Sequence, residues 1–463
     1  MDNFENTLNN NKSKKVVLLI AAMASFLTPF MGSSVNIAIP SIGKEFAIHV
    51  VLLGWIATAY LLAAAVFLVP FGRIADIYGR KRIFTYGILI YTISSLLCAI
   101  SSSVVMLISY RVLQGIGGAM IFGTGVAILT SVFPIGERGR ALGINVAAVY
   151  AGLSLGPFLG GLLTQYFGWR SIFIANVPLG LVIIAFVFWK LKGEWADARG
   201  EKFDLSGSII YGAAIVATVY GLSLLPAVLG IWVILIGISS FLIFIWWESK
   251  LASPVVHMDL FRKNTVFAFS NLAALINYSA TFAVTFLLSL YLQYAKGLSP
   301  QNAGFVLVTA PAVQAIFSPV AGRLSDKIEP RILASIGMGL TAIGLIPLIF
   351  LDRNTAIEFV LISLIILGFG FALFSSPNTN AVMSSVNKRA YGVASATLAT
   401  MRQIGMTLSM GIAMLIFAIC IGRVEITPEY YPSFLISIKI AFIIFAALCS
   451  GGIFASLARG KLR

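Results

Sequence analysis

Long apolar stretches alternate with short polar segments along almost the whole chain. Fourteen of these stretches approach the ~20 residues that a helix needs to cross a bilayer. We predict helical spans at approximately 16–38, 53–72, 83–102, 105–132, 141–164, 172–189, 207–226, 229–247, 265–294, 303–321, 333–351, 357–383, 391–420 and 433–457. The polar segments between them are linker-sized. The pattern therefore predicts an all-α integral membrane protein without a separate soluble domain.

The composition agrees with a chain whose solvent is lipid. The 463 residues are 59% hydrophobic and 11% charged, with a mean hydropathy of +0.96. The net charge of +15 raises the question of nucleic acid binding. With the N-terminus in the cytoplasm, however, 24 of the 32 Lys and Arg residues fall on cytoplasmic segments and five outside, while Arg111, Arg402 and Lys439 lie within spans. This bias places both termini in the cytoplasm and predicts no nucleic acid partner.

A charged loop occurs twice, as Gly72-Arg73-Ile74-Ala75-Asp76 and as Gly322-Arg323-Leu324-Ser325-Asp326. Duplicated halves are typical of secondary transporters. The two aspartates are 250 residues apart, whereas six spans with short loops take roughly 200. The surplus equals two further spans. We therefore predict six-helix bundles at 1–190 and 265–463, related by pseudo-two-fold symmetry, with linkers and an inserted two-helix hairpin at 191–264 that lies outside both bundles.

Four motifs carry a resemblance to a known family. They are Gly72-x3-Asp76-x2-Gly79-Arg80-Lys81-Arg82, Arg111-x2-Gln114-Gly115-x-Gly117-Gly118-Ala119, Gly152-x3-Gly156-Pro157-x2-Gly160-Gly161 and Phe203-Asp204-x2-Gly207. In this order and spacing the chain resembles, over nearly its whole length, the fourteen-helix drug-exporter branch of the major facilitator superfamily. The resemblance implies a monomeric drug–proton antiporter of the cytoplasmic membrane that works by alternating access.

The duplicated loops are the expected latch between the two halves. An aspartate there can pair with an arginine or cap a helix, and the resemblance implies that the loops lock and release the cytoplasmic side. The latch residues are Gly72, Asp76, Gly79, Arg80, Gly322 and Asp326. The second copy is eroded after Lys327, so we expect the first copy to dominate. The alternative for Arg80 is anchoring to anionic headgroups.

The third motif predicts a hinge or a close helix contact. Gly152, Gly156 and Gly160 share one helix face, where backbones can approach closely. Pro157 removes a backbone hydrogen bond and can kink the helix. A static contact between small residues is the alternative. In the resembled family this motif accompanies export rather than uptake.

Polar and charged residues within spans are the candidates for substrate binding and coupling, because such groups usually face the bundle interior. The resemblance implies that Arg111 lines the cavity and takes part in coupling. The substrate-cavity candidates are Asn36, Gln114, Tyr150, Asn277, Tyr278, Gln314, Asn378 and Arg402. Each of them can instead serve only to bridge two helices.

One expected acid is missing. Exporters of the resembled branch carry an aspartate in the first helix shortly before a Val-Asn-x-Ala-x-Pro stretch, which here is Val35 to Pro40. The aligned position is Met31, which we expect to face the transport pathway. None of the 17 acidic residues sits in the middle of a predicted span. This absence puts both proton coupling and the recognition of cations in question.

The sequence contains no pattern typical of an enzyme, a cofactor site or a metal site. The leading hypothesis is a secondary active transporter that exports small, mainly hydrophobic compounds. Its partners would be a small-molecule substrate, protons and the lipid bilayer. The first alternative is an exchanger or facilitator that exports an anionic metabolite or lipid without proton coupling. The second is a receptor or scaffold that transports nothing, against which the hinge glycines and latch aspartates argue.

Overall fold

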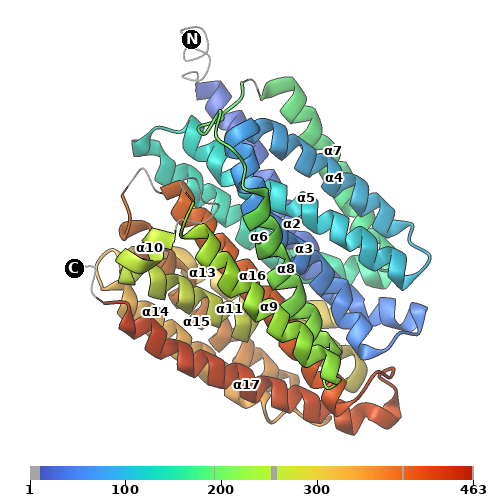
Figure 1. Cartoon of the computed structure of the whole chain (residues 1–463). Coiled ribbons are helices and arrows are strands. Elements are labelled where there is room, and N and C mark those ends of the chain that lie inside the picture. Colours follow the sequence, from blue (N-terminus) through green and yellow to red (C-terminus); the bar gives the residue numbers. More distant parts are fainter. Residues whose placement is uncertain (1–10, 192, 252–257, 388–390, 461–463) are drawn as a thin grey trace.

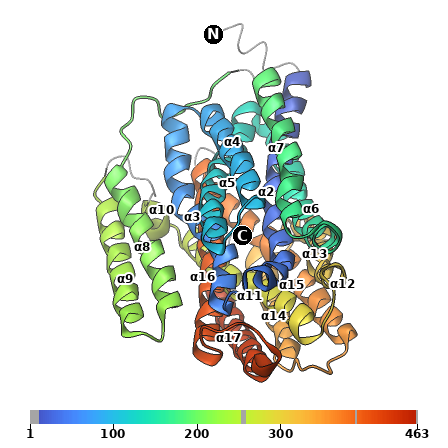
Figure 2. The same cartoon turned by 90° about the vertical axis from the view of Figure 1, so that its right-hand side faces the viewer.

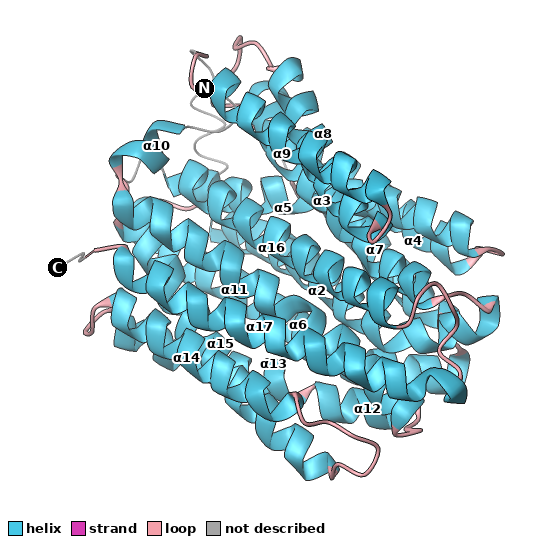
Figure 3. Cartoon of the chain, turned by 60° about the horizontal axis from the view of Figure 1, so that its bottom comes forward, coloured by secondary structure: helices cyan, strands magenta, loops and turns pink. Residues whose placement is uncertain are grey.

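The computed structural model describes residues 11–191, 193–251, 258–387 and 391–460 (Figure 1). Within these ranges the regular structure is entirely helical (Figure 3). Fourteen helical segments there are long and apolar enough to cross a membrane, as the sequence predicted. The spans are built from α2 (Asn11–Phe46), α3 (Val50–Tyr78), α4 (Arg80–Ala99), α5 (Val104–Val132), α6 (Ile135–Phe167), α7 (Arg170–Lys190), α8 (Leu205–Leu224), α9 (Val228–Glu248), α11 (Thr265–Leu290) with η1 (Tyr291–Ala295), α12 (Pro300–Leu307) with α13 (Thr309–Ser325), α14 (Pro330–Leu348), α15 (Ile357–Ser384), α16 (Tyr391–Cys420), and α17 (Tyr431–Ala458) preceded by η3 (Pro428–Tyr430). The short α10 (Met258–Lys263) precedes α11.

The two ends of the chain form bundles with the same internal packing. In the N-terminal half α2 packs against α6, α3 and α4 each pack against α5, and α4 packs against α7. The equivalent pairs in the C-terminal half are α11 with α16, α13 and α14 with α15, and α14 with α17. In Figure 1 the two halves occupy opposite sides of the molecule. This repeated packing agrees with the duplication in the sequence, while the division at residues 190 and 264 stays a prediction.

The inserted hairpin of α8 and α9 packs on the outside of the two bundles (Figure 2). Its helices approach each other closely: a Cβ on Gly237 would lie 2.5 Å from Thr218 Oγ1. Helix α8 contacts both α3 of the N-terminal half and α16 of the C-terminal half. The Tyr211 hydroxyl donates a 2.9 Å hydrogen bond to the carbonyl of Ala65 in α3. The hairpin therefore covers the seam between α3 and α16.

Several helices begin at polar residues that precede the apolar runs. The side chains of Ser103, Asp204, Asn264 and Ser299 each accept a backbone N–H three residues further on, at the starts of α5, α8, α11 and α12. Such caps satisfy N–H groups that have no partner within the helix. The Asp204 carboxylate also accepts from Trp247 Nε1 at 3.1 Å, which joins α8 to α9. The cap and this contact give Asp204 of the Phe203-Asp204-x2-Gly207 motif a structural role.

Two ends of the helical bundle must be distinguished. We call the end with the start of α2, the α3–α4 turn and the end of α17 the terminal end. The other end, with the α2–α3 turn, η1 and the end of α16, is called the far end. Most of the contacts that hold the two halves together, described below, lie at the far end.

Candidate functional site

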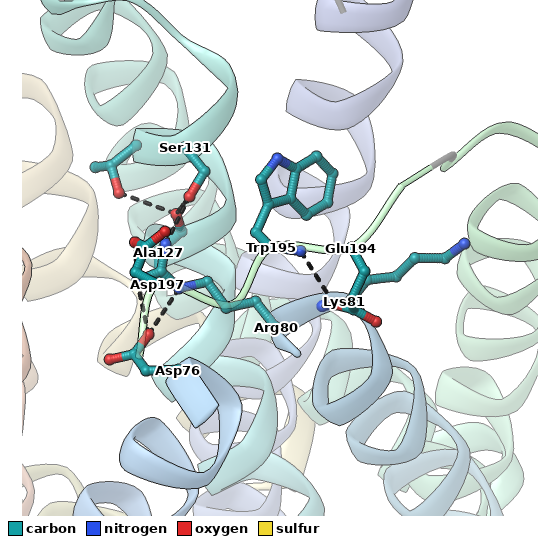
Figure 4. A network of polar contacts seen from close by, with 9 residues as sticks. Asp76, Arg80, Lys81, Ala127, Ser131, Glu194, Trp195 and Asp197 are labelled. Carbon is teal, nitrogen blue, oxygen red and sulfur yellow. Dashed lines mark hydrogen bonds and ion pairs between the residues drawn. The ribbon is translucent and has the colours of Figure 1, made fainter. Parts of the chain in front are cut away.

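The first signature loop forms a charged turn between α3 and α4 (Figure 4). Gly79 has a φ of 122°, which side chains disfavour, and the chain changes direction there. Arg80 reaches back to Asp76, with Nε 2.8 Å and Nη2 2.6 Å from Oδ1. Its Nη1 donates to Ser131 Oγ of α5 at 2.6 Å. The Asp76–Arg80 pair therefore ties α3, α4 and α5 together at the terminal end.

The linker before the hairpin docks on this turn through Glu194. The Glu194 carboxylate accepts from the backbone N–H of Lys81 at 2.8 Å and of Arg82 at 3.2 Å. It thus caps the N-terminus of α4, where a negative charge is favourable. Its side chain also fills the space next to Gly79, so a Cβ on this glycine would overlap it.

Two further acids of the linker pair with arginines of the same turn. Asp197 Oδ2 lies 2.8 Å from Arg80 Nη2, and Glu201 pairs with Arg73. Together with Glu194, these residues are called the acidic linker below. Sequence reasoning missed that acids of this linker contact the signature loop, because a charge in a linker carries no signal of its spatial partner.

The second signature loop is built differently. Asp326 caps the end of α13, and its Oδ1 accepts from Asn380 Nδ2 at 3.3 Å. The same amide donates to Ser325 Oγ at 2.9 Å. An amide of α15 thus contacts Asp326, whereas the arginine of the following helix contacts Asp76.

The glycine that opens each signature loop faces unoccupied space. A Cβ on Gly72 would meet no heavy atom within 4 Å, and one on Gly322 would meet only Ser376 Cβ at 4.0 Å. The mid-helix Gly32 of α2 likewise has nothing within 4 Å of a Cβ position. The side of each helix that a Cβ would occupy is thus open in this conformation, while the backbone of Gly72 lies close to Gly123 of α5, whose Cβ position is 3.4 Å from Gly72 N.

Arg111 is buried inside the N-terminal half and is only 1% exposed. Its Nε donates to the carbonyl of Ile56 in α3 at 3.1 Å, and Nη1 donates to Gln114 Oε1. Gln114 Nε2 donates in turn to Ser95 Oγ of α4 at 2.7 Å. The guanidinium also lies 4.5 Å from the ring centroid of Tyr60. Arg111 therefore joins α3, α4 and α5 through neutral partners.

The predicted hinge glycines pack α6 against α2 within the N-terminal half. A Cβ on Gly152 would lie 2.5 Å from the carbonyl oxygen of Phe26, and one on Gly160 would lie 2.8 Å from Ser34 Cα. Ser34 Oγ donates to the carbonyl of Gly156 at 2.9 Å. In this conformation the three glycines make a close helix contact, which was the alternative to a hinge.

The end of the same helix meets the other half at the far end. A Cβ on Gly161 would lie 2.6 Å from the carbonyl oxygen of Pro300, and one on Gly304 would overlap the carbonyl of Pro157. Helices α6 and α12 thus cross at backbone distance. Pro157, predicted as part of the hinge, lies at a contact between the halves.

Hydrogen bonds close the rest of the far end. Ser289 Oγ donates to the carbonyl of Asn36 at 2.7 Å, and Gln293 Nε2 donates to the carbonyl of Ile37 at 3.0 Å. On the other side of the bundle the backbone N–H of Val50 donates to the carbonyl of Val424 at 3.0 Å. The two halves are therefore held together on both sides of the far end, which is closed.

His49 caps α3 at this closed end with a titratable side chain. Its Nδ1 accepts the N–H of Leu52 at 3.3 Å, and burial, helped by the charge of Arg423, lowers the pKa of the imidazole. The cap needs the neutral ring, so its stabilisation is complete above the unfolded pKa of about 6.5 and is lost as the pH falls through the lowered value.

The variant His49→Asn keeps a cap that does not titrate. When the pH is lowered from neutral to about 5, we expect the melting temperature of the wild type to fall by about one to two degrees more than that of His49→Asn. Equal declines would show that the cap contributes nothing.

Polar side chains from both halves meet behind the far-end closure. The hydroxyl of Tyr150 in α6 lies 3.2 Å from Ser375 Oγ of α15. One helical turn further along α15, Thr379 Oγ1 accepts from Arg402 Nη2 of α16 at 2.6 Å. The Arg402 guanidinium lies 5.6 Å from the ring centroid of Tyr278 in α11. We call these five residues the central cluster; all but Ser375 are partly exposed.

The other cavity candidates divide into two groups. Asn36 and Asn277 are 3% and 2% exposed, and each keeps one buried amide atom without a hydrogen-bond partner, while Gln314 is partly exposed. Gln114 and Asn378 are directed into their own halves and are fully buried. The first group stays a candidate for substrate contact, and the second serves structure in this conformation.

Asn378 belongs to a buried arginine site that sequence reasoning missed. Its Oδ1 accepts from Arg459 Nη1 at 3.0 Å, and Arg459 also donates to Ser270 Oγ at 3.2 Å and to Ser456. Burial lowers the pKa of the Arg459 guanidinium to about 10. Nothing in the sequence separates this arginine from the other basic residues of the C-terminal segment.

The expectation for Met31 is wrong in this conformation. Its side chain is 0% exposed, and its sulfur lies 3.9 Å from Asn176 Nδ2 of α7. Met31 therefore packs inside the N-terminal half. The neighbouring Gly32 is the position of this turn that borders open space.

Comparisons with known proteins place the chain in a family. The family model described as Major Facilitator Superfamily matches residues 21–410 and 270–459. The riboflavin transporter RibZ of Clostridioides difficile strain 630 is 30% identical over 445 residues, covering 96% of each chain. The multidrug resistance protein Stp of Mycobacterium tuberculosis strain CDC 1551 / Oshkosh is 30% identical, covering 87% of this chain and 75% of the relative.

A solved structure supports the same fold. The crystal structure of a bacterial homologue of the human lysosomal transporter Spinster matches with a TM-score of 0.68. The match covers 97% of this chain and 98% of the other, at 16% identity. At that identity the similarity concerns the fold alone.

Proposed function

The chain belongs to the major facilitator superfamily, and on this premise we propose that it exports small, mainly hydrophobic compounds across the cell membrane by alternating access coupled to protons. It is a multi-pass membrane transporter of small molecules and not an enzyme. The exporter function and the proton are the parts that go beyond the family. The relatives include proteins named for multidrug resistance and for riboflavin transport, so the substrate class is open among small organic molecules.

One observation carries the proposal. The halves are joined at backbone distance at the far end, whereas the central cluster behind this closure stays partly exposed. A static scaffold has no need of a polar, half-exposed cluster at mid-helix, where uncompensated polar groups are costly. A transporter needs such a surface, exposed to one side of the membrane at a time.

The distribution of basic residues supports one orientation of the protein in the membrane. Since basic segments stay in the cytoplasm, we assign the terminal end to the cytoplasmic side, and the described conformation then faces the cytoplasm. In the opposite state, Gly72 and Gly322 would allow the signature loops to approach the other half. The Asp76–Arg80 pair and the acidic linker would control that approach.

A second candidate is exchange or facilitated export without protons. Within the described spans, acidic residues occur only in the end turns, such as Glu45, Asp76 and Glu358. A proton carrier at the membrane centre usually requires a carboxylate or histidine there. The dependence of transport on a pH gradient therefore distinguishes the two candidates.

Purified protein in liposomes, with a panel of hydrophobic dyes, tests both candidates. We expect dye flux in the wild type that an imposed pH gradient accelerates, and reduced flux in Asp76→Asn. Flux that ignores the pH gradient but responds to substrate on the opposite side would support the second candidate. Absence of flux for every dye under every gradient would overturn both.

A further inference from the structure

We propose that Arg402 and Tyr278 form a subsite for an anionic group, such as a carboxylate, carried by an otherwise apolar, aromatic substrate. This inference rests on the proposed transport function and names the substrate chemistry of the central cluster. Its starting point is a positive charge deep within α16. Arg402 is 11 residues from the start of the helix, or about 16 Å along its axis.

The residues that follow Arg402 fix its direction. Gln403 Nε2 donates to the carbonyl of Leu61 in α3 of the other half at 3.1 Å. A Cβ on Gly405 would lie 2.7 Å from the carbonyl oxygen of Leu275 in α11. Helix α16 is thus held against α11 on one side and α3 on the other. This arrangement places Arg402 beside Tyr278 at the junction of the two halves.

The guanidinium keeps unused hydrogen-bonding capacity. Nη2 donates to Thr379 Oγ1 at 2.6 Å, while the buried Nε has no hydrogen-bond partner. Arginine presents five donors in a planar fork that matches a carboxylate. Thr379 Oγ1 is the one acceptor found for this fork among the described residues, so the exposed part of the guanidinium has donors for a ligand.

The charge of Arg402 is also uncompensated within the described chain. Each ion pair found there involves residues at helix ends or in linkers, and none contains Arg402. A charge at mid-span is costly unless an opposite charge accompanies it. Arg111 shares this lack of an acid, but it is only 1% exposed and already binds Ile56 and Gln114. Arg402 is partly exposed, so an incoming anion can reach it.

Aromatic rings complete the subsite. The centroid of the Tyr278 ring lies 5.6 Å from the Arg402 guanidinium. Tyr150 contacts Ser375, which lies on α15 one helical turn before Thr379. Such rings provide flat apolar surface next to a polar tip. The arrangement fits an aromatic compound whose acid group reaches Arg402.

A matched dye pair tests the subsite: a fluorescent aromatic carboxylate and its neutral amide, measured for binding in detergent and for flux in liposomes. We expect Arg402→Gln to weaken the binding and the flux of the carboxylate dye about tenfold or more, which corresponds to about 1.4 kcal/mol. The binding and the flux of the amide dye should fall less than about twofold. Arg402→Lys should retain part of the preference, because it keeps the charge but not the fork. Lys439→Gln, which removes an exposed charge within α17, should change neither dye.

Each other outcome is decisive. Equal losses for both dyes at matched folded protein, or a wild type that fails to bind the carboxylate, would overturn the subsite. Binding without flux would support the subsite and overturn the proposed transport function instead. The binding assay in detergent is then repeated with added phosphatidylglycerol, which is anionic, and with added phosphatidylcholine as the control. This comparison separates the two possible sources of the anion. Competition by the anionic lipid would assign the subsite to a lipid headgroup, and its absence would assign it to a soluble acid.

Discussion

Replacing Arg111 with alanine is expected to abolish transport, to below about 1% of the wild-type rate. The change removes a fully buried guanidinium that joins α3, α4 and α5. It leaves the side-chain oxygen of Gln114 without its donor and removes a second hydrogen bond from the carbonyl of Ile56, which keeps its helical partner. An unsatisfied buried group costs about 1–3 kcal/mol, and a loss at the upper end of this range, acting on the transport cycle, corresponds to about a hundredfold in rate, since about 1.4 kcal/mol is tenfold. Flux per folded transporter in liposomes measures it.

Two variants control this result. Arg111→Lys should keep only a fraction of the rate, because an ammonium lacks the planar fork that reaches both acceptors. Lys439→Met removes an exposed basic residue of another span and should leave the rate unchanged. Full activity of Arg111→Lys would mean that charge alone suffices, and full activity of Arg111→Ala would remove this residue from the mechanism.

The Asp76→Asn variant should fold and insert normally but transport at least about tenfold more slowly. The amide retains a hydrogen-bond acceptor for Arg80 but loses the ion pair, in which the two groups lie 2.6 Å apart. We attribute the loss to a shift between conformations, for which coupling energies of about 1–3 kcal/mol, or 5–150-fold, are typical. Initial rates at matched expression give the comparison.

The second loop supplies the matched control. The signature is eroded after Lys327 in this copy, so Asp326→Asn should slow transport less than Asp76→Asn does. Asp197→Asn removes the linker acid that shares Arg80 with Asp76 and should have an intermediate effect. Equal or reversed effects of the two loop variants would contradict the assignment of the latch mainly to the first loop.

The fold was predictable because a bilayer imposes long apolar runs, and these can be counted from the sequence. The fourteen spans and their order are confirmed. The structure also pairs Asp76 with Arg80 across the α3–α4 turn, where the two residues are only four positions apart in the sequence. The latch and coupling roles of these residues stay predictions.

Contacts between distant parts of the chain could not be predicted. Glu194 caps α4 across more than a hundred residues of sequence, and Arg459 finds Asn378 from the end of the last helix. Met31 illustrates the same difficulty on one helix turn. Whether position 31 packs against α7 or borders open space depends on how α2 is rotated about its axis, and no local signal in a single sequence encodes this rotation.

Alternating access itself can be measured as two distances in one protein. Spin-label pairs at Ala47 and Glu429 would report on the far end, and pairs at Arg140 and Ser384 on the terminal end; all four positions are exposed. Pulsed electron spin resonance in liposomes, with and without a transported dye, then gives both distributions. We predict that the dye populates a second state in which the far-end distance lengthens while the terminal-end distance shortens. Distances that stay fixed at both ends in an actively transporting protein, or that lengthen together, would contradict alternating access between the two bundles.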